Sequence, residues 1–217
     1  GFIVHKIPTA DGIPDYEMIE QVADSDTILV SFMLVNNETG AIYDVRRISD
    51  IVKKANPAAI IHTDCTQAFL KIRFTAKSLG ADMITISGHK IGGPKGVGAL
   101  WVSPEILKKK AIVPIIFGGG QESGMRSGTE NTAAIAAMGA AMEHSCRDIA
   151  AKSAKMAGLR DRLISLLLEI PHSRLNGGMY PRLCGNVNMS FAGVEGESLV
   201  LGLDLRGVCA SSGSACS

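Results

Sequence analysis

The feature that most constrains the fold of this chain is the alternation of apolar runs with helical patterns in its first hundred residues. Apolar runs cover residues 27–34, 59–61 and 83–86, and helical patterns over residues 44–54 and 75–79 separate them. The first run is nearly unbroken, which is typical of a parallel strand that is covered on both faces. Strands that alternate with helices predict an α/β fold with a mostly parallel sheet flanked by helices.

A cluster of polar side chains follows each apolar run. The clusters are Asn36 with Asn37, Asp64 with Gln67, and Ser87 with His89 and Lys90. Ligands of open α/β sheets bind outside the carboxyl ends of the strands. We therefore expect the three clusters to share one edge of the sheet and to form a ligand site. The alternative is that all three are ordinary strand-to-loop turns.

Lys90 carries the most distinctive chemistry of the three clusters. A lysine packed against apolar residues tends to lose its proton, and a neutral amine can form a Schiff base. Ser87 and His89 supply a hydroxyl and an imidazole suited to a phosphate, and Asp64 could face the ring nitrogen of pyridoxal 5'-phosphate, which needs an anionic partner. These groups predict a pyridoxal-phosphate site. The alternative for Lys90 alone is a solvated loop lysine.

Composition excludes several other classes of protein. The 217 residues are 46% hydrophobic and 20% charged with a net charge of +1, so we expect a globular chain with no general attraction for nucleic acid or for a membrane surface. The longest apolar run, residues 133–142, is too short to span a bilayer. The five cysteines form no CxxC pair, which argues against a disulfide framework and against a metal site, and favours a reducing, cytoplasmic location.

The second half of the chain predicts a smaller domain. The expected elements are a helical stretch over residues 129–170 broken near Gly158, a half-buried strand over 186–191, a helix over 195–205 and a short strand over 208–210. We expect a large cofactor-binding domain over residues 1–145 and the beginning of a small α+β domain over residues 146–217. Residues 1–7 are expected to form a strand. Because neither end has a polar tail, we expect a fragment that is incomplete at both ends.

Several of these stretches resemble the cysteine desulfurases, which are pyridoxal-phosphate enzymes of fold type I in the class V aminotransferase group. The likeness rests on Val-Asn-Asn-Glu at 35–38, Asp-Cys-Thr-Gln at 64–67, Ser-Gly-His-Lys at 87–90 and Arg-Ser-Gly-Thr at 126–129. The ending Ser-Ser-Gly-Ser-Ala-Cys at 211–216 is similar to the catalytic-cysteine loop of the subgroup that serves iron-sulfur cluster assembly.

The resemblance implies a role for each matching residue. It implies that Lys90 forms the Schiff base, that Asp64 pairs with the pyridinium nitrogen and that Gln67 bonds the ring hydroxyl oxygen. Asn37 would lie near that oxygen and the substrate carboxylate, and Ser87 and His89 would hold the cofactor phosphate. Thr129 would reach the phosphate of the partner subunit, and Cys216 would accept sulfur. The implied catalytic residues are Lys90, His89 and Cys216. A contribution from Thr129 to the partner's site implies a homodimer.

The implied activity is removal of sulfur from L-cysteine to give L-alanine and a persulfide on Cys216. A sulfur-acceptor scaffold protein would then receive the sulfur for iron-sulfur cluster or thio-cofactor assembly. The alternatives are a selenocysteine lyase or related class V aminotransferase, and a non-catalytic truncated fragment. Members of the family begin before Gly1 and continue past Ser217, so the resemblance implies weak or no activity unless another chain completes the site. We expect Cys65, His62 and Trp101 to pack in the core.

Overall fold

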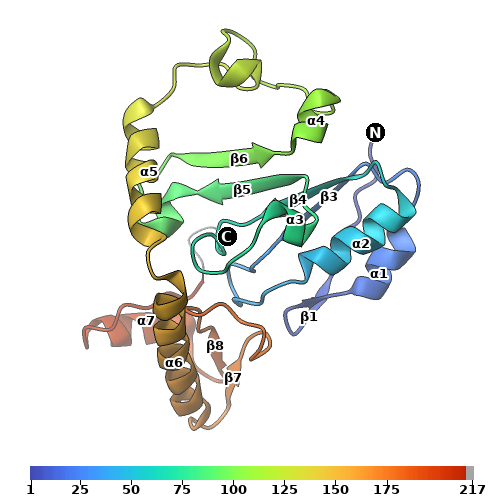
Figure 1. Cartoon of the computed structure of the whole chain (residues 1–217). Coiled ribbons are helices and arrows are strands. Elements are labelled where there is room, and N and C mark those ends of the chain that lie inside the picture. The colour runs from blue at the N-terminus through green and yellow to red at the C-terminus, as the bar shows by residue number, and fades with distance from the viewer. Residues whose placement is uncertain (214–217) are drawn as a thin grey trace. The chain divides into compact units, whose positions relative to one another are not determined.

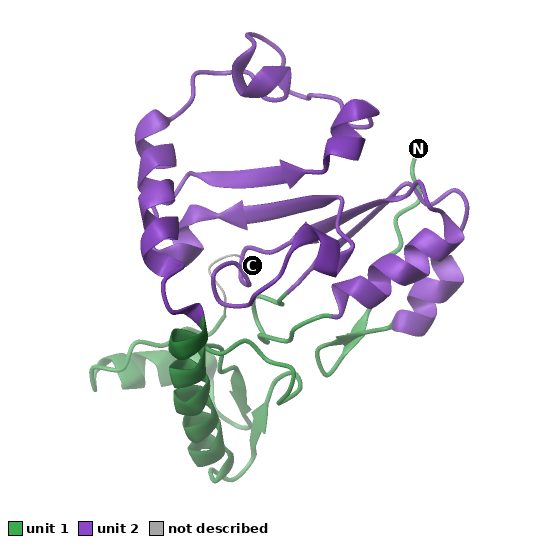
Figure 2. Ribbon diagram, viewed as in Figure 1, with its two compact units in different colours: residues 1–15, 35–43, 150–217 green, residues 16–34, 44–149 purple. Residues whose placement is uncertain are grey.

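The computed structural model describes residues 1–213 (Figure 1). The chain divides into two compact units (Figure 2). Unit 1 comprises residues 1–15, 35–43 and the described part of 150–217, and unit 2 comprises residues 16–34 and 44–149. The division into domains between residues 145 and 146 stays a prediction.

Unit 2 is built on a four-stranded sheet in the order β3 (Leu29–Met33), β4 (Ile60–Asp64), β5 (Met83–Ser87) and β6 (Gly98–Val102). Strands β3, β4 and β5 are parallel, and β6 pairs antiparallel with β5. The connection between β5 and β6 is too short for the crossover that a parallel pair needs, which explains the reversal. The sheet confirms the predicted α/β class with mostly parallel strands.

The helices of unit 2 bury one side of this sheet. Helix α2 (Val45–Ala55) contacts β3 and its neighbours α1 (Tyr16–Val22) and α3 (Ala76–Leu79). Its apolar stripe is almost fully buried and consists of Val45, Ile48 and Val52. The carboxylate of Asp44 accepts a hydrogen bond from the Arg47 amide, which satisfies one free amide of the first turn. The predicted helices over residues 44–54 and 75–79 are thus confirmed.

The two faces of the sheet differ in burial. Ile61 and Thr63 of β4 point to the face that carries the core and are fully buried. The opposite face carries more exposed apolar side chains, including Leu29, Met33 and Leu100. Trp101 on the edge strand β6 is 43% exposed, so the prediction that it packs in the core is wrong.

The remaining helices of unit 2 are short except for α5 (Thr132–Ser145), which follows α4 (Pro104–Lys108) and the 3-10 turn η2 (Gln121–Gly124). The predicted helical break near Gly158 is wrong. Helix α5 ends at Ser145 and α6 (Ile149–Leu168) begins after Asp148, whose φ of 54° is left-handed and cannot continue a helix. Gly158 lies inside α6, where a glycine costs only about 1 kcal/mol relative to alanine.

Unit 1 contains two small antiparallel pairs. Strands β1 (Thr9–Ala10) and β2 (Ile13–Pro14) form one, and β7 (Ser173–Leu175) and β8 (Met189–Phe191) form the other. Helix α7 (Gly196–Asp204) confirms the predicted helix after residue 195.

Two predicted strands of unit 1 are wrong. Residues 1–7 and 208–210 adopt no regular structure. Neither segment pairs with a strand in the part of the chain that the structure describes, and an apolar run forms a strand only where it finds such a partner. Within residues 1–213, no helix combines the length and the apolar character that crossing a bilayer requires.

Candidate functional site

The carboxyl end of β4 carries Asp64, the last residue of that strand. Its side chain is half-buried, and its Oδ1 accepts a hydrogen bond of 2.8 Å from the Thr66 amide. The Cys65 amide donates to the Thr85 carbonyl at 2.9 Å, so β4 stays paired with β5 up to this point. Gln67 follows in the turn and is also half-buried. The carboxylate of Asp64 is therefore held by its own turn at the strand end.

Asp64 and Ser87 come to the same face and edge of the sheet. Asp64 lies opposite Thr85 in the register of β4 and β5, and Ser87 follows Thr85 by two residues. Side chains two apart on a strand share a face. Two of the three predicted clusters are thus brought together at the carboxyl ends of neighbouring parallel strands.

The third feature of this edge is the 3-10 turn η1 (Gly88–Ile91), which carries His89 and Lys90. The Oγ of Ser87 lies 2.7 Å from Nδ1 of His89, within hydrogen-bond distance. His89 is exposed and Lys90 is half-buried. The hydroxyl of Ser145 on α5 donates to the Ile91 carbonyl at 3.0 Å, which fixes the end of the turn.

Close backbone approach explains the glycines around Lys90. The Gly88 amide donates to the Val97 carbonyl at 3.0 Å, and the Gly93 amide donates to the Gly88 carbonyl at 2.9 Å. A Cβ atom at Gly98 would lie 2.6 Å from the Ile86 carbonyl oxygen, which no side chain tolerates. The loop from η1 into β6 is therefore folded tightly over its own backbone and holds Lys90 at a defined place.

A polar row that the sequence did not reveal crosses the same sheet face. Nδ1 of His62 lies 2.7 Å from the Ser31 hydroxyl, and Nε2 lies 3.3 Å from the Thr85 hydroxyl. Burial lowers the pKa of His62, and the nearby Asp64 carboxylate partly offsets this. His62 is half-buried on the more exposed face of the sheet and lies outside the buried core, so the prediction that it packs in the core is wrong. Only the strand register shows Ser31 and Thr85 as its partners.

The cysteines of this region divide by burial. Cys65 is fully buried, as predicted, and burial together with the Asp64 charge raises the pKa of its thiol to about 12. Cys184 is also buried, whereas Cys146 and Cys209 are exposed. Cys216 lies outside the described residues. Residues 1–213 hold no cluster of three or more side chains suited to a metal ion.

Asn37 belongs to unit 1 and is half-buried in the loop after residue 35. Its Nδ2 donates to Oε1 of Glu38 at 3.3 Å. The neighbouring Asn36 shapes the loop, because its Oδ1 accepts hydrogen bonds from the amides of Glu38 at 3.0 Å and Thr39 at 2.8 Å. The loop is therefore a defined Asx-type turn.

Thr129 is exposed and lies just before α5, whose first turn is capped by Asn131. The preceding glycine-rich stretch is held by its own hydrogen bonds. The buried hydroxyl of Ser127 donates to the Gly119 carbonyl at 2.8 Å, and Nη1 of Arg126 donates to the Ser127 carbonyl at 3.0 Å. The structure does not test the functional roles predicted for Thr129 and the other site residues, and these roles stay predictions.

Comparison with known proteins decides the family. The family model described as aminotransferase class-V matches residues 1–217, which is the whole chain. The chain belongs to the class V aminotransferase family. One of its curated relatives is "Cysteine desulfurase IscS 1" of Archaeoglobus fulgidus, which is 46% identical to this chain over 218 residues.

Solved structures support the same assignment. A structure titled "NIFS-LIKE PROTEIN" superposes with a TM-score of 0.89 at 35% identity over 96% of this chain. A NifS-like protein from Rickettsia africae gives a TM-score of 0.87, also at 35% identity over 96% of the chain. The chain spans 55% of the Archaeoglobus protein and 56% and 57% of the two solved chains. This class V aminotransferase chain thus corresponds to about half the length of the relatives it matches.

Proposed function

We propose that this chain acts in a cysteine desulfurase, taking sulfur from L-cysteine and releasing L-alanine with pyridoxal 5'-phosphate as cofactor. The observation that carries the proposal is the meeting of Asp64, Ser87 and the turn with His89 and Lys90 at one edge of the sheet. Support also comes from the relatives, whose names include cysteine desulfurase.

The chemistry of this donor set fits the proposed cofactor. Asp64 presents a carboxylate that would hold the proton on a ring nitrogen, and the Ser87 and His89 pair offers two groups that can donate to a phosphate. Lys90 supplies the primary amine that a pyridoxal aldehyde requires. When bound, the cofactor would supply an electron sink for charge that develops on the substrate α-carbon.

Each further residue has a proposed task. We assign Gln67 and Asn37 to the oxygen of the ring hydroxyl, and Thr129 to the cofactor phosphate of a second subunit. The Lys90 amine would take the α-proton of the substrate and return it to form alanine. The Cys216 thiolate would attack the substrate sulfur, so that the carbon-sulfur bond breaks and the sulfur leaves as a persulfide on Cys216. The bonding electron pair would stay with the substrate β-carbon, which would take up the proton that the Cys216 thiol had released and so become the methyl group of alanine.

A homodimer is part of the proposal. Apolar side chains of the segment before η2 are strongly exposed: Val113 is 71%, Ile115 90% and Phe117 80% exposed. Exposed apolar groups gathered in one segment are typical of a surface that another chain covers. We further propose that a sulfur-acceptor scaffold protein receives the persulfide sulfur for iron-sulfur cluster or thio-cofactor assembly, and that the protein works in the cytoplasm.

The direct test is formation of alanine and sulfide from L-cysteine by the full chain with added pyridoxal phosphate and a thiol reductant. We expect Lys90→Ala and Cys216→Ala each to abolish both products. Alanine formation no higher than that of Lys90→Ala would contradict the proposal for this chain and favour a non-catalytic fragment. A selenocysteine lyase would be favoured by two results together: the unsubstituted chain releases no sulfur from cysteine, and Cys216→Ala still releases selenium from selenocysteine.

A further inference from the structure

The loop that carries Asn37 is fixed by side chains far away in the sequence. The Nδ2 atoms of Asn186 and Asn188 both donate to the Glu38 carbonyl oxygen, each at 3.0 Å, although they are 148 and 150 residues from Glu38. A carbonyl oxygen has two lone pairs and can accept both hydrogen bonds. The peptide group between Glu38 and Thr39, one residue beyond Asn37, is therefore held by two amide side chains at once.

Main-chain contacts hold the same loop from the same direction. The Leu183 amide donates to the Gly40 carbonyl at 2.8 Å, and the Ile42 amide donates to the Pro181 carbonyl at 3.1 Å. A Cβ atom at Gly40 would lie 2.5 Å from Cβ of Asn186, so the two segments are in direct contact. Residues 176–188, here called the bracing segment, thus lie directly against the Asn37 loop within unit 1.

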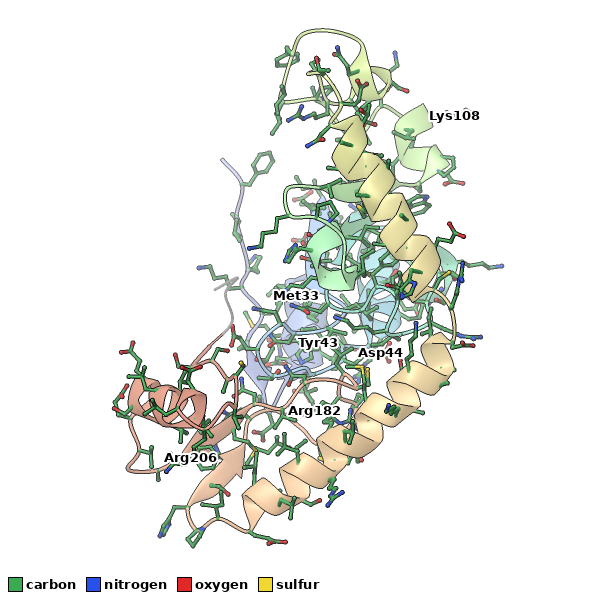
Figure 3. The ribbon with its side chains drawn as sticks, turned by 90° about the vertical axis from the view of Figure 1, so that its left-hand side faces the viewer. Met33, Tyr43, Asp44, Lys108, Arg182 and Arg206 are labelled. Carbon is green, nitrogen blue, oxygen red and sulfur yellow. The ribbon has the colours of Figure 1, made fainter. Side chains whose placement is uncertain are left out.

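Two buried arginines fix the bracing segment. Arg182, labelled in Figure 3, is 4% exposed, and its Nη1 donates to Oδ1 of Asn186 at 2.9 Å. Its Nε donates to the Gly178 carbonyl at 3.1 Å. Arg160 is 6% exposed and donates through Nη1 to the carbonyls of Arg182 and Leu183 at 2.8 and 2.9 Å. These buried donors leave the segment little freedom to shift.

The side-chain amides of Asn186 and Asn188 have the same orientation relative to the two segments. Oδ1 of Asn186 accepts from Arg182, and Oδ1 of Asn188 accepts from Nδ2 of Asn176 at 2.8 Å. The oxygen of each amide is therefore bonded inside the bracing segment, and the nitrogen of each is bonded to the Asn37 loop. This arrangement assigns the flip state of both amides from the hydrogen-bond network.

We propose that Asn186 and Asn188 are positioning residues for Asn37. Their donation to the Glu38 carbonyl sets the path of the backbone next to Asn37 and, through it, the direction in which the Asn37 amide points. The inference rests on the proposed function for the role of Asn37 toward the ring hydroxyl oxygen. It adds two residues that touch neither cofactor nor substrate but fix one that does.

Asparagine-to-aspartate changes test this with little change in shape. In the double variant Asn186→Asp/Asn188→Asp, the oxygens that accept from Arg182 and Asn176 remain, and each donor to Glu38 is replaced by a carboxylate oxygen, which cannot donate and repels the Glu38 carbonyl. Asn56→Asp is the matched control, because Nδ2 of Asn56 also donates to two carbonyls, those of Ser25 and Thr27, at 2.9 and 3.0 Å. That control removes two comparable bonds in unit 2.

The first readout is amide hydrogen exchange of the full chain without cofactor. Each lost hydrogen bond should raise local opening by about fivefold, so we expect exchange at Glu38, Thr39 and Gly40 to accelerate by about tenfold or more in the double variant. Asn56→Asp should leave these amides unchanged. Unchanged exchange in the double variant, with the fold retained, would overturn the inference. If the double variant does not fold, Asn188→Asp alone is measured by the same criterion, with about fivefold expected.

The second readout is the dissociation constant for pyridoxal phosphate in a double-mutant cycle with Asn37→Ala. We expect the double aspartate variant to weaken binding several-fold when Asn37 is present, and by less than about twofold when Asn37 is alanine. An undiminished effect in the Asn37→Ala background would overturn the inference, because the asparagines would then act elsewhere. Accelerated exchange together with no effect of Asn37→Ala on binding would instead contradict the proposed role of Asn37 and leave the bracing of the loop supported.

Discussion

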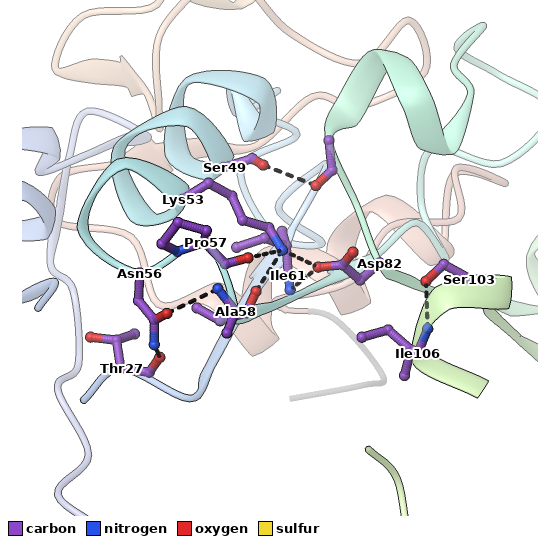
Figure 4. A network of polar contacts seen from close by, with 12 residues as sticks. Thr27, Ser49, Lys53, Asn56, Pro57, Ala58, Ile61, Asp82, Ser103 and Ile106 are labelled. Carbon is purple, nitrogen blue, oxygen red and sulfur yellow. Dashed lines mark hydrogen bonds and ion pairs between the residues drawn. The ribbon is translucent and has the colours of Figure 1, made fainter. Parts of the chain in front are cut away.

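Lys53 near the end of α2 ties that helix to the two central strands of the sheet (Figure 4). Its Nζ donates to the Ala59 carbonyl at 2.7 Å and to Oδ2 of Asp82 at 2.8 Å. The same Oδ2 accepts from the Ile61 amide at 2.9 Å. Because Asp82 directly precedes β5 and Ile61 lies near the start of β4, this network fixes the amino ends of the strands that carry Asp64 and Ser87. We predict that Lys53→Met destabilises unit 2.

The size of the effect follows from these contacts. Hydrogen bonds to charged groups are worth about 1.5–3 kcal/mol each when well desolvated. The side chains of Lys53 and Asp82 are 32% and 21% exposed, so solvent screens part of that energy. Lysine and methionine have similar helix propensities, so the backbone contributes little to the difference. We expect Lys53→Met to lower the free energy of unfolding by about 2 kcal/mol.

Urea unfolding followed by circular dichroism measures this change. Lys54→Met is the matched control, because Lys54 is exposed on the next position of the same helix, and it should change stability by less than about 0.5 kcal/mol. A double-mutant cycle with Asp82→Asn, which keeps an acceptor for the Ile61 amide, should give a coupling of about 1 kcal/mol. Equal stability of Lys53→Met and Lys54→Met would show that the Lys53 contacts do not stabilise unit 2.

Three further predictions concern side chains on β4 and directly after it. The Thr63 hydroxyl is buried without a hydrogen-bond partner among the described residues, so Thr63→Val should stabilise by about 1 kcal/mol and raise the melting temperature by about 2–4 °C; a lower melting temperature would contradict this. Cys65 is fully buried and its thiol pKa is about 12, so it should resist iodoacetamide at pH 8 in the folded chain, whereas the exposed Cys146 should react. Peptide mass spectrometry measures the labelling of each cysteine, and equal labelling of the two would contradict the burial of Cys65. Folding lowers the pKa of His62 below the ordinary histidine pKa of about 6.5. At pH values below about 6.5 the unfolded state therefore binds more protons than the folded state, and the free energy of unfolding should fall as the pH drops through 6.5. In urea titrations between pH 7.5 and 5.5, His62→Gln should lose the part of the pH dependence of the free energy of unfolding that His62 contributes. An unchanged pH dependence in His62→Gln would contradict this prediction.

The sequence was sufficient to predict the parallel strands β4 and β5 and the placement of the two polar clusters that follow them. The run before Asp64 and the run before Ser87 are apolar and short, and each ends in a turn, so pattern alone placed both strand ends. The helix predicted over residues 44–54 is observed at Val45–Ala55, because its apolar stripe and its Asp44 cap are local signals.

Three features were not predictable from the local sequence pattern. The helical break lies at residues 146–148 because Asp148 is left-handed there, whereas Gly158 alone gave the misleading signal. The partners of His62 require the register of three strands. The bracing of the Asn37 loop depends on contacts between residues about 150 positions apart, for which the local sequence carries no periodic signal.

We propose that Lys90 lies at a site built for pyridoxal phosphate. The most direct measurement is to mix the full chain with pyridoxal phosphate, reduce with borohydride, desalt, and locate any pyridoxyl group by peptide mass spectrometry, with Lys90→Ala as the control. We expect modification of Lys90 above all other lysines, together with a visible absorbance band before reduction that Lys90→Ala lacks. Modification spread evenly over exposed lysines, with the same spectrum in Lys90→Ala, would contradict it.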